Sequence, residues 1–364
     1  MKKNKILIIT GGTGGHVIPA INFFNYIKNN SNNVFLVTDN RGYKYISNSD
    51  KKNILKIHSS HLTGNISFKL LGLIKLLIGF LQSLIIYIKL RPKTIVSFGS
   101  YASFTPLICF VFFKYFFKTK LYLHEQNSLI GQTNKLFSKK ANKIFVNFDK
   151  EYPSLNKYKN KIVVVGLPQK KINENSNYIL NKSENNINFL IFAGSQGSLD
   201  ILNYFSKLIN EIKKLPNLKK INFIVQCPTQ MQDQIKNLLS NNNFNFQIKS
   251  FFNNFDHILS KTNIALCRSG AGTINDLINY KIPAIILPLP SSKNNHQFEN
   301  AKILSDIGCA ILADRDSKEL NKILMFMRNV IDDKSFNNSL IDKYSKIKRY
   351  NTNLLMWNHI QDDQ

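Results

Sequence analysis

A histidine that follows a glycine-rich loop near the start of the chain is the first feature that indicates chemistry. The apolar run at residues 6–9 leads directly into the sequence TGGTGGH, which ends at His16. Glycine lets the main chain approach a ligand without a Cβ in the way, so the backbone N–H groups of such a loop can contact the ligand. Imidazole accepts a proton near neutral pH, which makes His16 a candidate general base. A tight strand-to-helix turn with a solvent-facing histidine is the alternative.

Two further polar clusters follow apolar runs in the first half of the chain. The sequence GSYAS begins at Gly99, and the sequence HEQN occupies residues 124–127. If the runs before them are parallel strands, both clusters lie at the same carboxyl edge of the sheet as His16, where open α/β sheets bind ligands. Because polar groups there need hydrogen-bond partners, the clusters predict either a shared site or a structural network.

The second half of the chain repeats this arrangement. An apolar run at 188–192 precedes the sequence AGSQGS, and another at 264–267 precedes RSGAGT. Small residues that open a helix leave its first N–H groups and its dipole available to a diphosphate. Asp276 lies one turn inside this helix, where its carboxylate can accept hydrogen bonds from ribose hydroxyls. An ordinary helix start with an acidic first turn would have the same pattern.

The alternation of short apolar runs with helical spacing predicts an α/β fold. With 364 residues, the chain is long enough for two domains with substantial cores. We predict two Rossmann-like domains whose parallel sheets face each other across a cleft. The expected domains are residues 1–166 and 188–337, joined by a linker at 167–187 and followed by a helical segment at 338–364 that packs back toward the N-terminal domain.

The sequence predicts neither a metal ion nor an organic cofactor. Asp314-Arg315-Asp316 matches the DxD pattern of metal-dependent sugar transferases, but its place between a short strand and a helix favours a capping turn. Asp39 follows the second strand, where dinucleotide-binding folds keep a ribose carboxylate. However, Val17 stands where the third glycine of that fingerprint belongs. The four cysteines are far apart, which favours reduced thiols of a cytosolic protein.

The charge of the chain is strongly positive and unevenly distributed. The formal net charge is +27, because 49 Lys and Arg stand against 22 Asp and Glu. Such a surface attracts nucleic acid or an anionic membrane. Between residues 51 and 124 there is no acidic residue, and this region contains two very apolar segments, 68–90 and 106–117. Nucleic-acid binding would instead place basic residues among exposed aromatic residues in a groove, so this coincidence favours a membrane.

The first apolar segment is long enough to span a bilayer. A single crossing there would place the first glycine loop and the later strands on opposite sides of the membrane, and Lys75 would cost about 2.5 to 3.5 kcal/mol at the bilayer centre. We therefore expect the segments 68–90 and 106–117 to rest on an anionic membrane surface. Two helices packed on the sheet of a lysine-rich protein are the alternative.

Five short motifs occur in an order that resembles one enzyme family. They are GGTGGH at 11–16, HEQN at 124–127, GSQG at 194–197, RSGAGT at 268–273 and HQxxNA at 296–301. In this set the chain resembles the MurG family, glycosyltransferases of family 28 with a GT-B fold. The resemblance implies transfer of N-acetylglucosamine (GlcNAc) from UDP-GlcNAc to the C4 hydroxyl of the N-acetylmuramic acid (MurNAc) of undecaprenyl-pyrophosphoryl-MurNAc-pentapeptide (lipid I). The product would be lipid II of peptidoglycan synthesis, formed with inversion and without a required metal.

The resemblance also implies a location and a role for individual residues. The enzyme would lie at the cytoplasmic face of the bacterial inner membrane, as a peripheral protein beside other cell-wall synthesis proteins. His16 is the leading candidate for the base, with Glu125 as the second candidate or as its orienting partner. The donor sugar and diphosphate would be approached by Thr13, Gly14, Gly15 and Asn127. The nucleotide would be held by Ser195, Ala271, Gly272, Thr273, Ile274, Asn275, Asp276 and Gln297, with Phe252 where the family packs a residue against uracil.

Two departures from the family pattern bear on these roles. The family reads Gly-Asn-Pro-Val-Arg at the domain junction, whereas this chain has Gly-Leu-Pro-Gln-Lys ending at Lys170. Lysine keeps the charge but loses the planar fork of arginine. The ribose-binding glutamate of the family is Asp276 here, one methylene shorter. A UDP-GlcNAc 2-epimerase, or a transferase to another lipid, remains the alternative on the same fold, and a basic nucleic-acid-binding protein is a more distant one.

Overall fold

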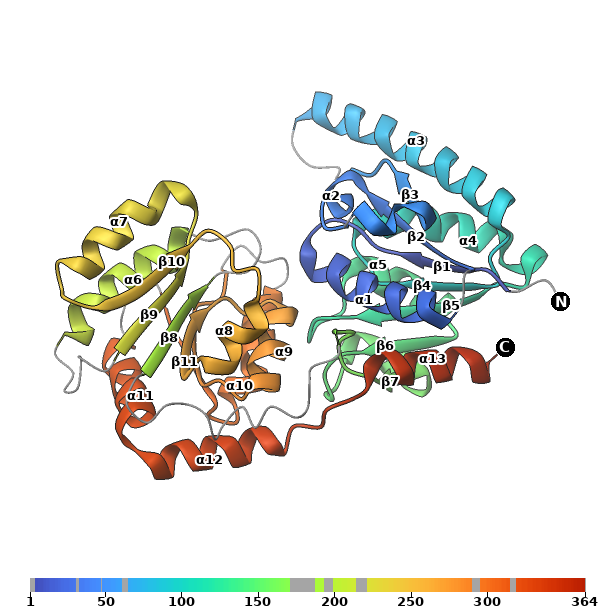
Figure 1. Cartoon of the computed structure of the whole chain (residues 1–364). Coiled ribbons are helices and arrows are strands. Elements are labelled where there is room, and N and C mark those ends of the chain that lie inside the picture. The colour runs from blue at the N-terminus through green and yellow to red at the C-terminus, as the bar shows by residue number, and fades with distance from the viewer. Residues whose placement is uncertain are drawn as a thin grey trace. The chain divides into compact units, whose positions relative to one another are not determined.

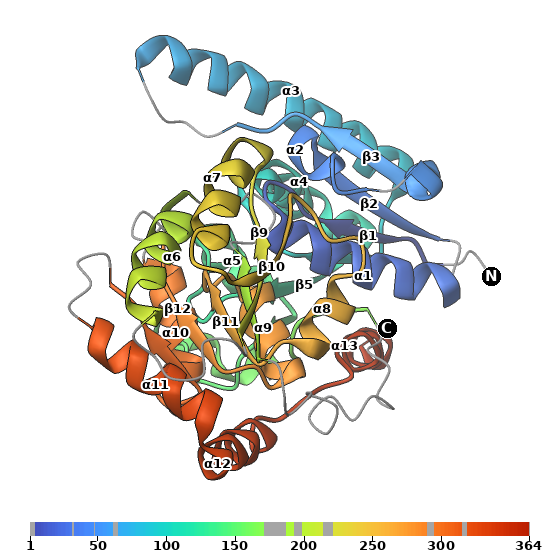
Figure 2. The same cartoon turned by 60° about the vertical axis from the view of Figure 1, so that its left-hand side comes forward.

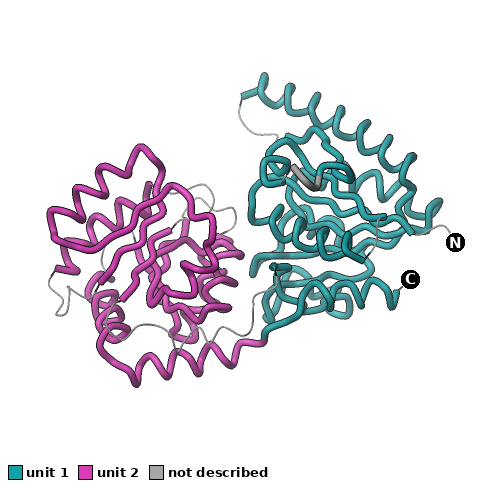
Figure 3. Tube along the Cα trace, in the orientation of Figure 1, with its two compact units in different colours: residues 1–172, 349–364 teal, residues 173–348 magenta. Residues whose placement is uncertain are grey.

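The chain forms two compact units, which are coloured separately in Figure 3. Residues 1–172 and 349–364 make unit 1, and residues 173–348 make unit 2. The computed structural model describes residues 4–30, 33–46, 48–60, 65–170, 187–192, 199–213, 221–289, 295–314 and 319–363. Most of the linker expected at 167–187 therefore lies outside the described residues.

Unit 1 is built on a seven-stranded parallel sheet with the order β3-β2-β1-β4-β5-β6-β7 (Figure 1). Its strands are β1 (Ile6–Ile9), β2 (Val34–Asp39), β3 (Ile54–Ile57), β4 (Thr94–Ser97), β5 (Lys120–Glu125), β6 (Lys143–Val146) and β7 (Ile162–Val164). Its α-helices are α1 (Gly14–Asn30), α2 (Asn40–Tyr43), α3 (Ile66–Leu90), α4 (Phe104–Phe117), α5 (Gln132–Phe137) and α13 (Thr352–Asp362). Short 3₁₀ helices are η1 (Asn48–Asn53), η2 (Tyr101–Ser103), η3 (Ser138–Lys140) and η4 (Pro153–Lys161).

Unit 2 is built on a six-stranded parallel sheet with the order β10-β9-β8-β11-β12-β13. Its strands are β8 (Ile187–Phe192), β9 (Ile221–Gln226), β10 (Asn245–Lys249), β11 (Ile264–Cys267), β12 (Ala284–Ile286) and β13 (Ala310–Leu312). Its helices are α6 (Leu199–Ile212), α7 (Thr229–Ser240), α8 (Phe255–Lys261), α9 (Ala271–Tyr280), α10 (His296–Ser305), α11 (Leu320–Asp332) and α12 (Lys334–Ser345). The two parallel sheets confirm the predicted α/β class.

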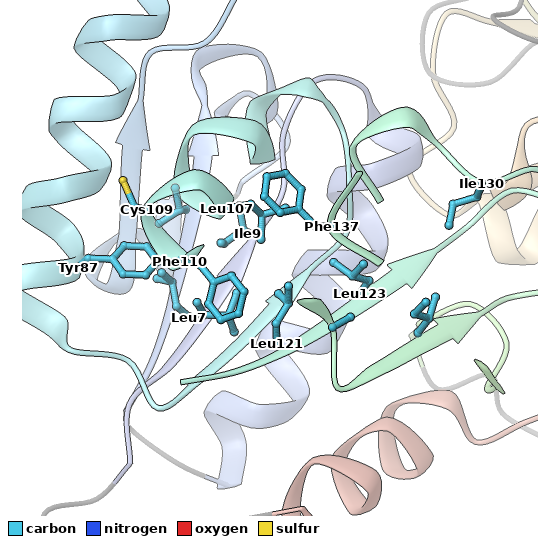
Figure 4. Packing of buried hydrophobic residues seen from close by; sticks show 14 of the residues in the cluster. Leu7, Ile9, Tyr87, Leu107, Cys109, Phe110, Leu121, Leu123, Ile130 and Phe137 are labelled. Carbon is cyan, nitrogen blue, oxygen red and sulfur yellow. The ribbon is translucent and has the colours of Figure 1, made fainter. Parts of the chain in front are cut away.

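The side chains of β1 alternate between two apolar layers of unit 1, because successive residues of a strand point to opposite faces of the sheet. Leu7 and Ile9 pack in one cluster with Tyr87 of α3 and Phe110 of α4, as Figure 4 shows. Ile6 and Ile8 belong to the opposite cluster, which α1 and α13 complete. Figures 1 and 2 show α3 and α4 over one face of the sheet and α1 and α13 by the other. Helices thus cover both faces of the parallel sheet, as such sheets require.

The last helix, α13, packs against the sheet of unit 1. Met356 and Ile360 of α13 are fully buried in the cluster that contains α1. Asp363 accepts a hydrogen bond from the Tyr122 hydroxyl at 3.0 Å and forms an ion pair with Lys143 at 3.1 Å. The segment expected at 338–364 is therefore not one element: α12 belongs to unit 2, and only α13 packs on unit 1.

Gly79 lets α3 approach the end of β3 closely. A Cβ at this position would overlap the carbonyl oxygen of His58. Because this oxygen belongs to the backbone, it cannot move away by a change of rotamer. The long apolar helix is therefore seated on the sheet through its glycine-bearing face.

We expect Gly79→Ala to lower the free energy of unfolding of unit 1 by about 1–3 kcal/mol, because overpacking forces a backbone shift. Trp357 of α13 is the single tryptophan of the chain, so its fluorescence during urea unfolding reports on unit 1. Lys75→Ala, at an exposed position of the same helix, should stay within about 0.5 kcal/mol of the unmodified protein. Equal unfolding midpoints for the two variants would contradict this account.

Candidate active site

Four neighbouring strands of unit 1 end in polar residues at one edge of the sheet. In sheet order these are β2, β1, β4 and β5, all parallel, so their carboxyl ends are side by side. The glycine loop follows β1, Asp39 ends β2, the segment from Phe98 follows β4, and His124 and Glu125 end β5. The predicted convergence of these clusters on one edge is confirmed.

His16 lies in the first turn of α1, two residues after the helix begins at Gly14. Its Nδ1 atom is 2.9 Å from the carbonyl oxygen of Phe98, which follows β4. Because a carbonyl oxygen only accepts, the neutral ring carries its hydrogen on Nδ1 and keeps the lone pair on Nε2. The imidazole is half-buried. This tautomer has the form that a general base needs.

The carboxylate of Glu125 organises the loop that follows β5. Its side chain is buried, and its two oxygens accept four hydrogen bonds. The donors are the N–H and Nδ2 of Asn127, the N–H of Gly131 and the Nδ2 of Asn134, at 2.8–3.3 Å. With both oxygens occupied in this way, the carboxylate is held in one orientation. The geometry therefore suits Glu125 to holding Asn127 in place.

His124 is fully buried behind this edge. Its Nε2 donates to the carbonyl oxygen of Gly166 at 2.9 Å, and its ring stacks on Phe98 with the centroids 5.0 Å apart. Burial, with a smaller contribution from the neighbouring His16, lowers the pKa of His124 to about 4. His124 therefore stays neutral at physiological pH.

Asp39 holds the glycine loop from the side of β2. Its Oδ1 accepts the N–H groups of Gly12 and Gly42, each at 2.9 Å, and its Oδ2 accepts the hydroxyls of Ser59 at 3.0 Å and Tyr101 at 3.2 Å. Asp39 is buried, and these inward hydrogen bonds occupy the carboxylate that a dinucleotide-binding fold would turn toward a ribose. Gly12 has φ +79°, a conformation that glycine adopts without strain.

In unit 2, helix α9 begins at the predicted RSGAGT motif. Gly270 precedes its first residue, Ala271, and no side chain of the described residues caps this end. Among the described residues, nothing lies within 4 Å of the position that a Cβ of Gly272 would take. The first N–H groups of the helix and its dipole thus form an accessible anion-binding end. Asn275 bonds back to the Ala271 carbonyl at 2.9 Å, and Ile274 is buried.

Three other residues of the predicted nucleotide site lie in unit 2. Burial, with a smaller contribution from the nearby carboxylate of Asp256, raises the pKa of Asp276 to about 7. Gln297 accepts the N–H of Leu289 at 2.9 Å, which orients its carboxamide. Phe252 is buried, and the Lys249 ammonium lies 6.0 Å from its ring centroid.

Some predicted residues are exposed or lie outside the described part of the chain. Thr13, Gly15 and Lys170 are exposed, whereas Gly14 is buried and Asn127 is half-buried. Ser195, with residues 193–198, lies outside the described residues, as do Arg315 and Asp316 of the DxD pattern.

Sequence reasoning missed several interactions that shape the edge of unit 1. The Phe98 carbonyl orients His16, Asn134 braces Glu125, and Asp39 holds the loop. In unit 2, Arg268 bonds to the carbonyl oxygens of Leu287 and Pro288 and to Asp200. Backbone carbonyls leave no signal in a sequence. The one available hint was an aspartate in a buried strand end, which needs partners.

Both units resemble known glycosyltransferase domains in sequence. Residues 6–146 match the glycosyltransferase family 28 N-terminal domain, and residues 188–351 match the glycosyltransferase family 28 C-terminal domain. A UDP-N-acetylglucosamine--N-acetylmuramyl-(pentapeptide) pyrophosphoryl-undecaprenol N-acetylglucosamine transferase from Rickettsia bellii is 33% identical over 329 residues, covering 88% of each chain. The enzyme of the same name from Vesicomyosocius okutanii is 32% identical over 355 residues, covering 95% of this chain and 96% of its own.

Solved structures show the same fold. Acinetobacter baumannii MurG superposes with a TM-score of 0.76 at 20% identity and covers 98% of this chain and 99% of its own. A putative UDP-N-acetylglucosamine 2-epimerase from Listeria monocytogenes has a TM-score of 0.64 at 13% identity, with 97% and 93% covered. At these identities the likeness concerns the fold alone, which is GT-B-like.

The buried neutral His124 predicts a pH dependence of stability. Since its folded pKa of about 4 is below the ordinary 6.5, the unfolded chain binds more protons between these values. The free energy of unfolding therefore has its full value, as far as His124 is concerned, above pH 6.5. It decreases as the pH falls toward 4, by about 3 kcal/mol in total. We expect His124→Gln to lose less stability over this range than the unmodified protein, as measured by Trp357 fluorescence at pH 7, 5.5 and 4.5.

The difference between the two proteins in how the free energy of unfolding changes with pH isolates His124. Other titrating groups, such as His359, are common to His124→Gln and the unmodified protein. His257→Gln, at an exposed position of unit 2, should keep the slope of the unmodified protein. Parallel slopes for all three proteins would mean that His124 is not held neutral by burial.

Proposed function

Because this chain belongs to glycosyltransferase family 28, we propose that it transfers GlcNAc from UDP-GlcNAc to lipid I, giving lipid II for peptidoglycan synthesis. The observation that carries this proposal is the extent of the likeness. Enzymes named for this transfer share 32–33% identity over 88% or more of this chain, and both family domains match in order. The chain is thus a hexosyltransferase whose donor is UDP-GlcNAc and whose acceptor is a membrane lipid.

On the acceptor side, His16 is the base that we favour. Its Nδ1–H donates to the Phe98 carbonyl, so Nε2 is available for the proton of the MurNAc C4 hydroxyl. That oxygen forms a bond to the anomeric carbon of GlcNAc, the bond to the diphosphate breaks, and UDP leaves with the electron pair. Attack opposite the leaving group inverts the anomeric centre. Glu125 acts as a positioning residue through Asn127, because its oxygens are occupied by four hydrogen bonds.

On the donor side, the N-terminal end of α9 stabilises the charge that develops on the departing UDP. The helix dipole and the N–H groups from Ala271 to Thr273 supply fixed positive partial charge. Asp276 accepts from the ribose, and Gln297, oriented by Leu289, supports the nucleotide. In the same proposal, Phe252 packs against uracil, and the donor sugar is approached by Thr13, Gly14, Gly15 and Asn127. The donor-binding roles that the family resemblance implies are kept by Ser195, Ile274 and Asn275. Lys170, where the family has arginine, contacts the phosphates.

A large apolar surface on α3 and α4 is the proposed membrane contact. Eleven large apolar side chains of α3 are exposed, and α4 adds Phe112, Tyr115 and Phe116. Helix α3 is long and apolar enough to cross a membrane by length and composition. However, β3 before it and β4 after it belong to one hydrogen-bonded sheet, and Gly79 seats the helix on β3. These features favour a helix that lies along the surface of the bilayer, as interfacial helices do.

Basic residues lie at the end of this apolar surface. A cavity of about 570 Å³ at the C-terminal end of α4 is lined by Lys114, Lys118, Lys139, Lys140 and Lys161, together with Tyr115, and none of the described residues that line it is acidic. Each cation near an anionic leaflet contributes about 1 kcal/mol of attraction. We therefore place the enzyme at the cytoplasmic face of the inner membrane as a peripheral protein, within reach of other cell-wall synthesis proteins.

The transfer itself is tested with labelled UDP-GlcNAc and a lipid I analogue, with and without EDTA. We expect a disaccharide product in both cases, and His16→Ala should reduce turnover by about 10² to 10⁴ while the affinity for UDP-GlcNAc stays unchanged. His58→Ala, at an exposed histidine after β3, is the matched control and should retain activity. Near-normal turnover of His16→Ala would remove the residue from the role of base.

The same assay distinguishes the other enzyme on this fold. An epimerase would convert UDP-GlcNAc without any lipid acceptor, so incubation of donor alone should leave it unchanged if the proposal is correct. Loss of transfer with EDTA would instead point to a metal-dependent enzyme and reopen the role of Asp314.

Membrane contact is tested by vesicle sedimentation with phosphatidylcholine containing phosphatidylglycerol. We expect Leu77→Glu combined with Phe116→Glu to weaken binding at least about tenfold, because each side chain loses about 1.5–3 kcal/mol of burial and gains a charge that the surface repels. Met325→Glu, at an exposed apolar residue of unit 2, is the control. Equal binding of both variants would exclude the α3 and α4 surface as the contact.

A further inference from the structure

Arg41 occupies an exposed position at the edge of unit 1 where the proposed acceptor site lies. It follows β2 and belongs to the short helix α2. Its Nη1 donates to the hydroxyl of Tyr101 at 2.9 Å, and its guanidinium carbon lies 5.8 Å from the centroid of the Tyr101 ring. A long surface side chain is thus held in one place, although it is not buried.

The direction of these hydrogen bonds is fixed by Asp39. The buried carboxylate of Asp39 only accepts, so the Tyr101 hydroxyl must donate to it, across 3.2 Å. The lone pairs of that hydroxyl are then available to Arg41. Burial raises the pKa of Tyr101, and the charge of Asp39 raises it further, so the hydroxyl remains protonated. The chain Asp39–Tyr101–Arg41 therefore orients the guanidinium from inside the protein.

The same carboxylate ties Arg41 to the glycine loop. Asp39 accepts the N–H groups of both Gly12 and Gly42. A Cβ on Gly42 would lie 3.2 Å from the Cα of Gly11 and 3.1 Å from a methyl group of Val17, so these segments are in contact. Arg41 precedes Gly42, and His16 precedes Val17. The backbone of Arg41 and that of His16 therefore adjoin one contact at the same edge of the sheet. A Cβ on Gly12 of the loop would lie 3.6 Å from the ring of Tyr101, which holds the guanidinium.

Arginine is uncommon in this chain, and its chemistry differs from that of lysine. Of the 49 Lys and Arg residues, only six are arginine. A guanidinium presents five N–H donors in a planar fork that matches the oxygens of phosphate groups, whereas an ammonium is a point charge. In the proposed acceptor, a diphosphate is attached to the same sugar ring whose C4 hydroxyl reacts at His16.

We propose that Arg41 binds the diphosphate of the lipid acceptor, and that Asp39 and Tyr101 are positioning residues that hold its guanidinium beside the glycine loop. This inference rests on the proposed function, because it takes the sugar of the acceptor to be at His16. It adds a residue that distinguishes diphosphate-linked acceptors from other hydroxyl acceptors.

The test compares two acceptors, lipid I with a shortened chain and the same MurNAc-pentapeptide carried on a neutral alkyl glycoside. Arg41→Gln should raise KM for the diphosphate acceptor about 10- to 100-fold, the range for loss of charged hydrogen bonds. Its kcat and its KM for UDP-GlcNAc should change less than twofold. The neutral acceptor should be used equally well by Arg41→Gln and by the unmodified enzyme.

Two matched variants separate this role from general electrostatics and from packing. Lys44→Gln removes a positive charge from an exposed residue three positions away and should leave KM for the diphosphate acceptor within about twofold, the scale of surface charge effects. Tyr101→Phe should raise this KM by a smaller factor than Arg41→Gln. The double variant should be no worse than Arg41→Gln, because Tyr101 acts through Arg41.

An alkyl diphosphate without sugar supplies a probe that does not depend on turnover. It should inhibit the unmodified enzyme competitively with the acceptor, and Arg41→Gln should raise its inhibition constant by the same factor as KM. An unchanged inhibition constant, or equal losses with both acceptors, would overturn the role of Arg41. If the unmodified enzyme fails to glycosylate any diphosphate acceptor, the proposed function fails first, and the two failures are thus distinguishable.

Discussion

The parallel pairing of β1 with β2 on one side and with β4 on the other is the constraint on which the site of unit 1 depends. Parallel strands all end at the same edge, so residues that are far apart in the chain meet there without any long-range signal in the sequence. His16 and Phe98 are 82 positions apart and form one hydrogen bond. That bond fixes the tautomer of the imidazole, and the proposed chemistry follows from the nitrogen it leaves available.

Two buried carboxylates complete this edge, and each is satisfied by four hydrogen bonds. Asp39 braces the glycine loop on the β2 side, and Glu125 braces the loop after β5. An ionised carboxylate is costly to bury unless donors surround it, and here half of the donors are backbone N–H groups of the surrounding loops. The acids therefore contribute by fixing the backbone, while the histidine between them keeps a free nitrogen.

The uneven distribution of charge and apolar surface is consistent with an enzyme whose acceptor is a lipid. Helix α3 keeps most of its apolar side chains exposed, although Gly79 and Tyr87 seat it on the sheet. Exposed apolar surface of this extent in a folded unit usually marks a surface that binds a partner. Unit 2, by contrast, presents the uncapped end of α9, where backbone N–H groups are available to an anion.

The sequence by itself determined the α/β class, the positions of the strands and the motif order that identifies the family. The strands were recognisable as short apolar runs between helical segments, because a strand buried on both faces of a parallel sheet is apolar along its whole length. The sequence pattern predicted the ends of the helices less well than their presence. His16 lies inside the first turn of α1, which begins at Gly14, and the C-terminal segment expected at 338–364 is divided between two helices in different units. Only the tertiary structure decided that Glu125 is saturated, that Asp39 faces inward, and that Tyr101 orients Arg41. Each of these depends on which donor lies within 3.3 Å of which oxygen, and that distance is set by packing of distant segments.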